Sequence, residues 1–287
     1  MIRLIAILIM AGGACGAARA DGISDGQRCA ATGNDPDVAI NYCVRAIYSG
    51  DLNGEQLAAT FYNRGVEYKK KGDYEQAIKD FDSAIKLRPD FVRAYNSRGV
   101  AYYETGEDAL AIADFDAAIE MMPGEASLRR NRGMIRFYRS EFAAAVPDMQ
   151  AAMQLAPDDA QGALWLFLAQ ARSGLMAGDA LGRFAAGRDL NPWPGPAVAM
   201  FLGMIGPEAV VGIGRAAFEQ GDARRQCQAY FYVGQYQLVR GMRDNATEFF
   251  RAAVASGAVG AMEYTGAVAE LARMGETGLT AAGTGAN

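Results

Sequence analysis

The chain has 287 residues, of which 51% are hydrophobic and 21% are charged, so it is long enough for one or two globular units with a sizeable core. It contains no histidine, which excludes histidine-based catalytic triads and histidine-containing metal sites. Its four cysteines show no CxxC spacing that would replace them. The formal net charge of −5 argues against a nucleic-acid-binding protein. The composition favours a binding or scaffolding protein without catalytic residues or a cofactor.

The N-terminus has the three parts of a secretory signal peptide. Arg3 supplies the positive charge, residues 4–11 form a short apolar run, and Ala18-Arg19-Ala20 is a small-residue cleavage site. We therefore expect residues 1–20 to be removed before Asp21. Because this segment carries two of the 28 basic residues and no acidic residue, its removal leaves 26 basic and 33 acidic residues, a net charge of −7. The chain is predicted to be exported.

Cys15 opens an alternative, because bacterial lipoproteins are lipid-modified at a cysteine that follows the apolar run. The preceding Gly12-Gly13-Ala14 lacks the leucine that usually opens such a motif. We favour cleavage after Ala20, and contact with the membrane is expected only if Cys15 is lipidated.

Three cysteines follow the predicted signal peptide, in what export makes an oxidising compartment. Cys29 and Cys43 bracket a short loop in which Asp35-Pro36 has the sequence of a helix start. A disulfide between them would tie the N-terminal segment to the start of the first helix, whereas a redox-active pair lacks basic neighbours that would activate a thiol. Cys227 is left either as a buried thiol or as a partner for an intermolecular disulfide.

The main signal is internal repetition with a period of 34 residues. Five columns keep this period over three successive units: Gly65, Gly99 and Gly133; Ala77, Ala111 and Ala145; Phe81, Phe115 and Met149; Ala84, Ala118 and Ala152; and Pro89, Pro123 and Pro157.

These columns resemble the tetratricopeptide repeat (TPR) over residues 58–159. The resemblance implies an all-α solenoid of helical hairpins wound into a right-handed superhelix, with a capping C-terminal helix. The small residues mark the point where the two helices of a hairpin, A and B, cross closely, and the proline ends helix B. Turns are expected near Gly72, Gly106 and Ser140.

Outside these repeats the pattern weakens but continues to near residue 275. The expected organisation is a signal peptide at 1–20, an N-terminal segment with a capping helix at 21–57, three repeats at 58–159, a divergent repeat plus two helices at 160–226, a further TPR-like repeat and capping helix at 227–275, and a disordered tail at 276–287.

The second half sharpens the resemblance. Ala163-Leu-Trp-Leu-Phe-Leu-Ala169, Trp193-Pro194 and Ala229-Tyr-Phe-Tyr-Val-Gly234 closely resemble the NlpI-like periplasmic TPR proteins. Members of that family are lipoprotein adaptors that dock a tail-specific protease and present a peptidoglycan hydrolase to it, and the best-known member is a homodimer. This chain departs from the family in its poor lipidation motif and in its cysteine-bearing N-terminal segment.

The resemblance implies a periplasmic, non-catalytic adaptor, with a protease and a wall hydrolase as partners and a homodimer as its assembly. The alternative function is a general periplasmic assembly scaffold or chaperone-like factor without a protease partner. An enzyme would need a convergent catalytic site, and the sequence contains none.

In a TPR stack the concave wall is lined by helix A, and the projected lining is basic and aromatic although the chain is acidic. Such a wall would attract an acidic or carboxylate-ended segment. The alternative role for the rings is to complete the core. The predicted partner-binding residues are Tyr62, Asn63, Lys69, Arg93, Asn96, Tyr103, Arg130, Asn131, Phe137, Tyr138 and Trp165, and Val66, Lys70, Met134 and Arg172 line the same wall.

Two further patterns concern charge. Arg64, Arg98 and Arg132 recur with the period, as do Asp80, Asp114 and Asp148, and we expect structural ion pairs between hairpins rather than a recognition surface. The two-carboxylate clamp of chaperone-binding TPR proteins is not expected, because Tyr62 and Val66 stand where its first lysine–asparagine pair would be.

Overall fold

The computed structural model describes residues 22–31, 35–175 and 178–276, and every regular element within these ranges is an α-helix. The predicted signal peptide, Cys15 and the tail beyond Glu276 lie outside these ranges. Within them, no helix combines the length and the apolar character needed to cross a membrane. The helices are α1 (Gly22–Ala31), α2 (Pro36–Ser49), α3 (Gly54–Lys70), α4 (Tyr74–Leu87), α5 (Val92–Glu104), α6 (Asp108–Met121), α7 (Ala126–Tyr138), α8 (Phe142–Leu155), α9 (Ala160–Arg172), α10 (Gly178–Ala185), α11 (Gly195–Phe201), α12 (Pro207–Glu219), α13 (Ala223–Val239), α14 (Arg243–Ala255) and α15 (Met262–Arg273).

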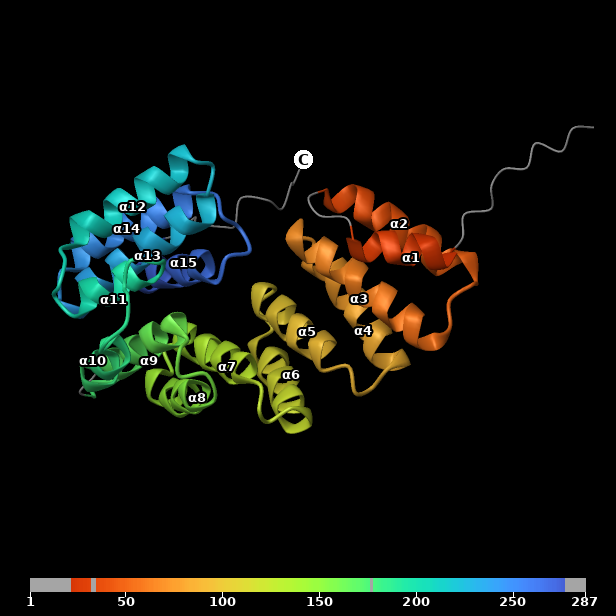
Figure 1. The fold of residues 1–287 in the computed structure, drawn as a ribbon, viewed down its shortest axis with the longest axis horizontal. Helices are drawn as coiled ribbons and strands as arrows, with labels where there is room; N and C mark the ends of the chain where they lie inside the picture. The colour runs from red at the N-terminus through yellow and green to blue at the C-terminus, as the bar shows by residue number, and fades with distance from the viewer. Residues whose placement is uncertain (1–21, 32–34, 176–177, 277–287) are drawn as a thin grey trace, which may run out of the picture.

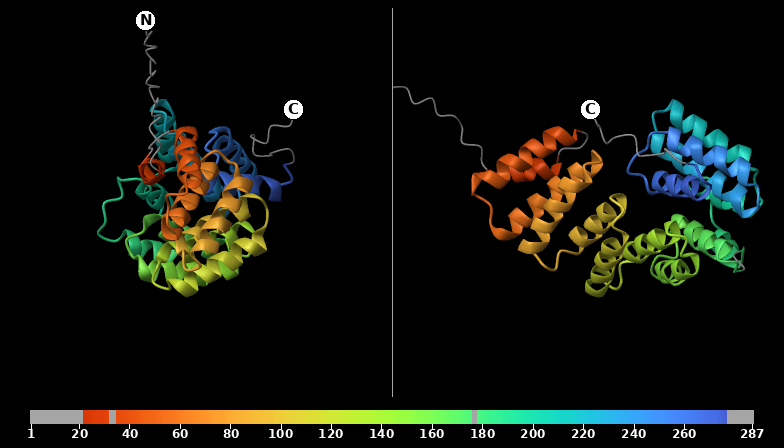
Figure 2. Two further views of the ribbon diagram at one scale, coloured as in Figure 1. Left: turned by 90° about the vertical axis from the view of Figure 1, so that its right-hand side faces the viewer. Right: turned by 180° about the vertical axis from the view of Figure 1, so that it is seen from behind.

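The helices stack as antiparallel hairpins along a curved path (Figure 1). The three predicted repeats are the hairpins α3–α4, α5–α6 and α7–α8, so the predicted all-α TPR solenoid is confirmed. The first helices of the hairpins contact one another in order, α3 with α5, α5 with α7 and α7 with α9, and α13 contacts α9. These helices form the inner wall of the curve, seen from behind in Figure 2. We call the groove that this wall lines the concave channel.

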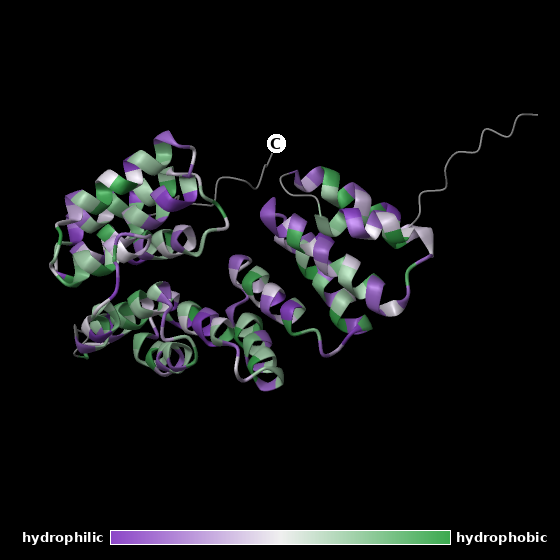
Figure 3. Cartoon of the chain, viewed as in Figure 1, coloured by the Kyte–Doolittle hydropathy of each residue, from purple (hydrophilic) through white to green (hydrophobic). Residues whose placement is uncertain are grey.

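Glycine sets the distance between the two helices of each hairpin. A Cβ atom added to Gly99 would lie 3.2 Å from the carbonyl oxygen of Ala111 and from the ring of Phe115. The predicted turns are also present, with a left-handed φ of 77° at Gly72 and of 64° at Ser140. Polar and apolar residues alternate around most of these helices, as amphipathic hairpins require (Figure 3).

The repeated arginines and aspartates form ion pairs, but within each hairpin rather than between hairpins as predicted. Arg64 contacts Asp80 within its own hairpin, with a side-chain nitrogen–oxygen distance of 2.7 Å. Arg98 does the same with Asp114 and also pairs with Asp82 of the preceding hairpin. Because Asp80 and Asp114 are only 4% and 5% exposed, their charges need these partners. These ion pairs therefore join helices within and between repeats.

The predicted N-terminal capping helix is α2, and α1 before it is a second helix that the sequence did not predict. The predicted disulfide joins Cys29 of α1 to Cys43, which lies in the middle of α2 rather than at its start. Asp35 caps α2 by accepting hydrogen bonds from the backbone of Asp37 and Val38. The disulfide thus closes a helical hairpin that covers α3.

Cys227 is free and completely buried in the hydrophobic core, so the predicted buried thiol is correct. Burial raises the pKa of this thiol to about 12. The alternative of an intermolecular disulfide is wrong for this folded state, because the sulfur has no access to a second chain.

The second half follows the predicted order with shifted boundaries. Helix α13 begins at Ala223, before the predicted start of the later repeat at residue 227. Gly234 crosses Phe250 closely, so α13–α14 is built like the earlier hairpins. Helix α15, the last in the described residues, packs on α13 and α14 as a cap and also reaches back to α7.

Replacing Gly99 by leucine should overpack the crossing of α5 and α6 and lower the free energy of unfolding by about 1–3 kcal/mol. Urea unfolding followed by circular dichroism measures the loss. Gly212→Leu is the control, because Gly212 is exposed on α12 and an added Cβ meets nothing within 4 Å. Equal stability of the two variants would show that the crossing is not tight.

Replacing both Cys29 and Cys43 by serine should cost about 3 kcal/mol in the chain-entropy model, because the disulfide closes a loop with a sequence separation of 14. Urea unfolding of this variant is compared with that of the oxidised protein. An unchanged unfolding free energy would mean that α1 and α2 pack equally well without the covalent link.

Candidate functional site

The aromatic end of the predicted binding surface lies in the core rather than on an open wall. Phe137 and Trp165 are fully buried and Tyr138 is 5% exposed. The Trp165 ring lies 5.4 Å from that of Phe137, 5.6 Å from Tyr138 and 5.5 Å from Phe231, measured between centroids. The prediction that these three residues contact a partner is wrong for this state, because other parts of the chain cover them.

The cover is α15, which lies inside the concave channel (Figure 1). The Tyr138 hydroxyl donates a 2.7 Å hydrogen bond to the backbone oxygen of Met262, and Arg273 donates to the backbone oxygens of Phe137 and Tyr138. A Cβ atom on Gly266 would lie 2.7 Å from the Tyr138 ring and 2.8 Å from Phe231. The glycine therefore lets α15 approach the aromatic wall.

Side chains of the channel bind two acidic residues of α15. Glu263 and Glu270 are spaced two helical turns apart, and each is 1% exposed. Arg172 donates to the carboxylate of Glu270 at 2.6 Å, and Gln235 donates to it at 2.9 Å. Burial alone would raise the pKa of Glu270, but the positive charges of Arg172 and Arg273 lower it overall.

Glu263 is held by neutral donors instead of a cation. Gln161 and Gln228 donate amide hydrogen bonds to its carboxylate at 2.8 and 3.2 Å, and the Tyr232 hydroxyl lies 3.4 Å away. In the second half of the channel, the acidic groups that bind to the wall therefore belong to α15 of the same chain.

Other predicted residues are engaged with neighbours. The Tyr62 ring packs 4.9 Å from Phe91, and Tyr103 stacks 5.7 Å from Tyr138, both between centroids. The Asn131 amide donates to the Asn96 side chain at 2.9 Å. Arg130 pairs with Asp159, which caps the start of α9.

Three predicted residues keep uncommitted polar groups. Asn63, Lys69 and Arg93 make no side-chain hydrogen bond or ion pair with any residue in the described ranges. They lie on α3 and α5, before the part of the channel that α15 fills. We call the stretch of the channel that these two helices line its open part.

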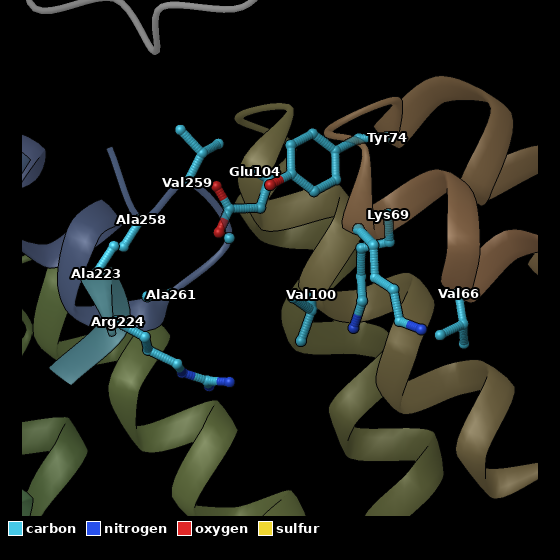
Figure 4. A pocket seen from close by; sticks show the side chains of 12 residues that line it. Val66, Lys69, Tyr74, Val100, Glu104, Ala223, Arg224, Ala258, Val259 and Ala261 are labelled. Carbon is cyan, nitrogen blue, oxygen red and sulfur yellow. The ribbon is translucent and has the colours of Figure 1, made fainter. Parts of the chain in front are cut away.

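A cavity of about 450 Å³ adjoins the open part (Figure 4). One wall comes from α3–α5, and the other comes from the start of α13 and the loop between α14 and α15. Val66, Lys69 and Lys70 were predicted from the sequence to line the wall. Other residues that line the cavity were not predicted: Tyr74, Glu104, Arg224 and the 258–261 loop.

Glu104 had a signal in the sequence, because it stands 34 residues after Lys70 and therefore shares its place on helix A. Arg224 had none, because the irregular segment before α13 breaks the period. The described residues contain no cluster of three or more cysteine, aspartate or glutamate side chains that could hold a metal ion.

Comparison with known proteins agrees with this architecture. Residues 65–106 match a family model described as TPR repeat, and residues 92–124 match one described as tetratricopeptide repeat. The chain therefore contains TPR repeats, and such repeats stack into extended concave binding surfaces.

Two solved structures have similar folds. A tetratricopeptide repeat protein from Parabacteroides merdae ATCC 43184 is similar with a TM-score of 0.53 and 16% identity, covering 83% of this chain and 93% of that one. MamA from residue 41 to its end, from Desulfovibrio magneticus RS-1, is similar with a TM-score of 0.50 and 22% identity, covering 57% of this chain and 90% of that one.

Replacing Glu270 by glutamine leaves Arg172 and Arg273 without their buried counter-charge, so the free energy of unfolding at pH 7 should fall by about 3 kcal/mol. Because the pKa of Glu270 is below its ordinary value of 4.5 in the folded chain, this contribution is complete above pH 4.5 and disappears as the pH falls through the lowered pKa.

The difference between the native chain and Glu270→Gln should therefore shrink in acid, as measured by denaturant unfolding at several pH values. Glu219→Gln removes an exposed carboxylate of α12 that has no ion pair with a described residue, and it should change little. A difference independent of pH would contradict the ionised pair.

Proposed function

We propose that this protein is a non-catalytic adaptor that binds an acidic segment of a partner protein in the open part of its concave channel. The observation that carries this proposal is the way the channel holds α15, whose buried Glu270 is bound by Arg172 and Gln235. The same surface continues over α5 and α3, where Arg93 and Lys69 form no ion pair with a described residue. Because the chain as a whole has a net charge of −5, these cations make the open part an exception to its overall negative charge.

The proposed place of action is the bacterial cell envelope, after export to the periplasm. This rests on the predicted signal peptide at 1–20 and is supported by the Cys29–Cys43 disulfide, a bond favoured in oxidising compartments. The proposed partners are a tail-specific protease and a peptidoglycan hydrolase presented to it, as the resemblance to NlpI-like proteins implies. The rival function is an assembly scaffold without a protease partner.

Affinity capture from envelope extract distinguishes these functions. Recovery of a tail-specific protease together with a wall hydrolase supports the adaptor, whereas recovery of outer-membrane or surface assembly proteins alone supports the rival. Sedimentation of the purified protein measures the homodimer that the resemblance implies.

Arg93→Glu should reduce capture of the partner at least tenfold, because reversing a charge in the open part replaces attraction of an acidic segment by repulsion. Quantitative mass spectrometry of the captured proteins measures the effect. Arg215→Glu is the matched control, because Arg215 is an exposed arginine of α12 and the net charge changes equally. Equal loss in both variants, or no loss in Arg93→Glu, would place partner binding outside the open part.

A further inference from the structure

The cavity beside the open part joins segments that are far apart in the sequence. Lys69 reaches it from the end of α3, Glu104 from the end of α5 and Arg224 from the start of α13. Figure 4 shows the Lys69 and Arg224 side chains directed toward the same space from its two walls. No single repeat contains these groups, so the cavity exists only because the solenoid closes on itself.

The cavity has an excess of unpaired donors. Neither Lys69 nor Arg224 forms an ion pair or side-chain hydrogen bond with a described residue, and the buried Tyr74 hydroxyl has no hydrogen-bond partner. Lys70 differs, because its ammonium contacts Glu67 at 2.7 Å. Two cations and one hydroxyl therefore face a cavity that offers them a single carboxylate, that of Glu104.

Glu104 can offset at most one of the two cations, and it also binds α15. Its carboxylate accepts a 2.9 Å hydrogen bond from the Thr265 hydroxyl of α15. Burial lowers the pKa of Lys69, and the nearby Arg224 lowers it further against the attraction of Glu104. Burial likewise raises the pKa of Glu104. Both shifts disfavour the charged forms, as expected where burial outweighs the attraction between the two groups.

The remaining lining is aliphatic. Val66 and Val100 come from neighbouring repeats, and Val259 comes from the loop before α15. A volume of about 450 Å³ with an apolar wall and a few converging polar groups is typical of a ligand site. A ligand that satisfies all of these groups carries one negative charge, an aliphatic side chain and a hydrogen-bond donor for Glu104.

We propose that this cavity binds the C-terminal residue of a partner polypeptide, with its carboxylate between Lys69 and Arg224 and its aliphatic side chain against Val66 and Val100 of the α3–α5 wall. The last residue of a chain carries its carboxylate, side chain and peptide N–H on one Cα and its neighbours, so a single residue offers a partner for each of the three kinds of group that line the cavity. An internal acidic residue presents its carboxylate at the end of a side chain, away from its N–H.

The assignment deepens the proposed function and rests on it for the nature of the ligand. The proposed site uses Lys69, near the end of helix A, and Arg224 of α13. It differs from the chaperone clamp, whose first lysine–asparagine pair would stand at Tyr62 and Val66, which carry no charge.

The test is a titration of the purified protein, labelled at its valine methyl groups, with N-acetyl-valine. Saturable shifts of the Val66 and Val100 methyl resonances are expected. N-acetyl-valinamide lacks the carboxylate, and the α-amide of N-acetyl-glutamic acid carries it only on the side chain. Both should bind at least tenfold more weakly. Equal binding of either probe, or no saturable shift with N-acetyl-valine, would overturn the proposal.

Lys69→Met and Arg224→Met should each weaken N-acetyl-valine at least tenfold, with Arg215→Met as the matched control. Lys69→Met removes a buried charge while keeping an apolar stem, so its helical circular dichroism and Tm should equal or exceed those of the native chain. Binding that survives both cavity substitutions would overturn the proposal.

Capture from envelope extract separates this inference from the function on which it rests. A Lys69→Met chain that still captures partners lost by Arg93→Glu would contradict the cavity assignment while supporting partner binding in the open part. Capture lost in Arg224→Met, which lies outside the open part, and kept in Arg215→Met would support the cavity. If the native chain captures no partner, the proposed function fails, and the titration alone then decides whether the cavity binds a terminal carboxylate.

Discussion

The close approach of paired helices at glycine is the constraint on which the rest of the structure depends. At Gly65 and Gly133 a Cβ atom would come within 3.0 Å of the Phe81 ring and the Met149 methyl group, respectively. Because the crossing fixes how each hairpin closes, it also fixes the face that the next hairpin covers, and hence the curve of the stack. Gly234 repeats this geometry against Phe250, so regular packing resumes after the irregular segment between α9 and α13.

The same device divides the channel. Gly266 allows α15 to lie against Tyr138 and Phe231, so the aromatic half of the wall becomes core and the lysine- and arginine-bearing half stays accessible. A groove filled by its own chain at one end presents a shorter and more selective surface than an open superhelix. Its chemistry is shown by what it already holds, since the buried carboxylate of Glu270 is matched by Arg172 and Arg273.

The parts that followed from the sequence are those that repeat. The 34-residue period predicted the hairpins, the tight crossings and the participation of Arg98 and Asp114 in ion pairs, because each depends on residues within one repeat. Trp165 was assigned to a partner surface because the return of α15 is a contact between distant segments that no local pattern encodes. Gly266 was a sign in the sequence that this helix packs closely against another part of the chain. It lies between two glutamates that are buried, and it faces aromatic rings, whereas an exposed capping helix would not require a glycine there.

The return of α15 has a consequence for how the chain folds. In an open repeat array each unit contacts only its neighbours, so folding can begin at any unit and spread to the next. Here Thr265 bonds to Glu104 and Met262 to Tyr138, contacts that span 161 and 124 residues. Such pairings form late, because the intervening loop must close first. The aromatic wall around Trp165 therefore stays uncovered until the final helix emerges, and this makes the interval before α15 docks the time at which the chain is most prone to aggregate.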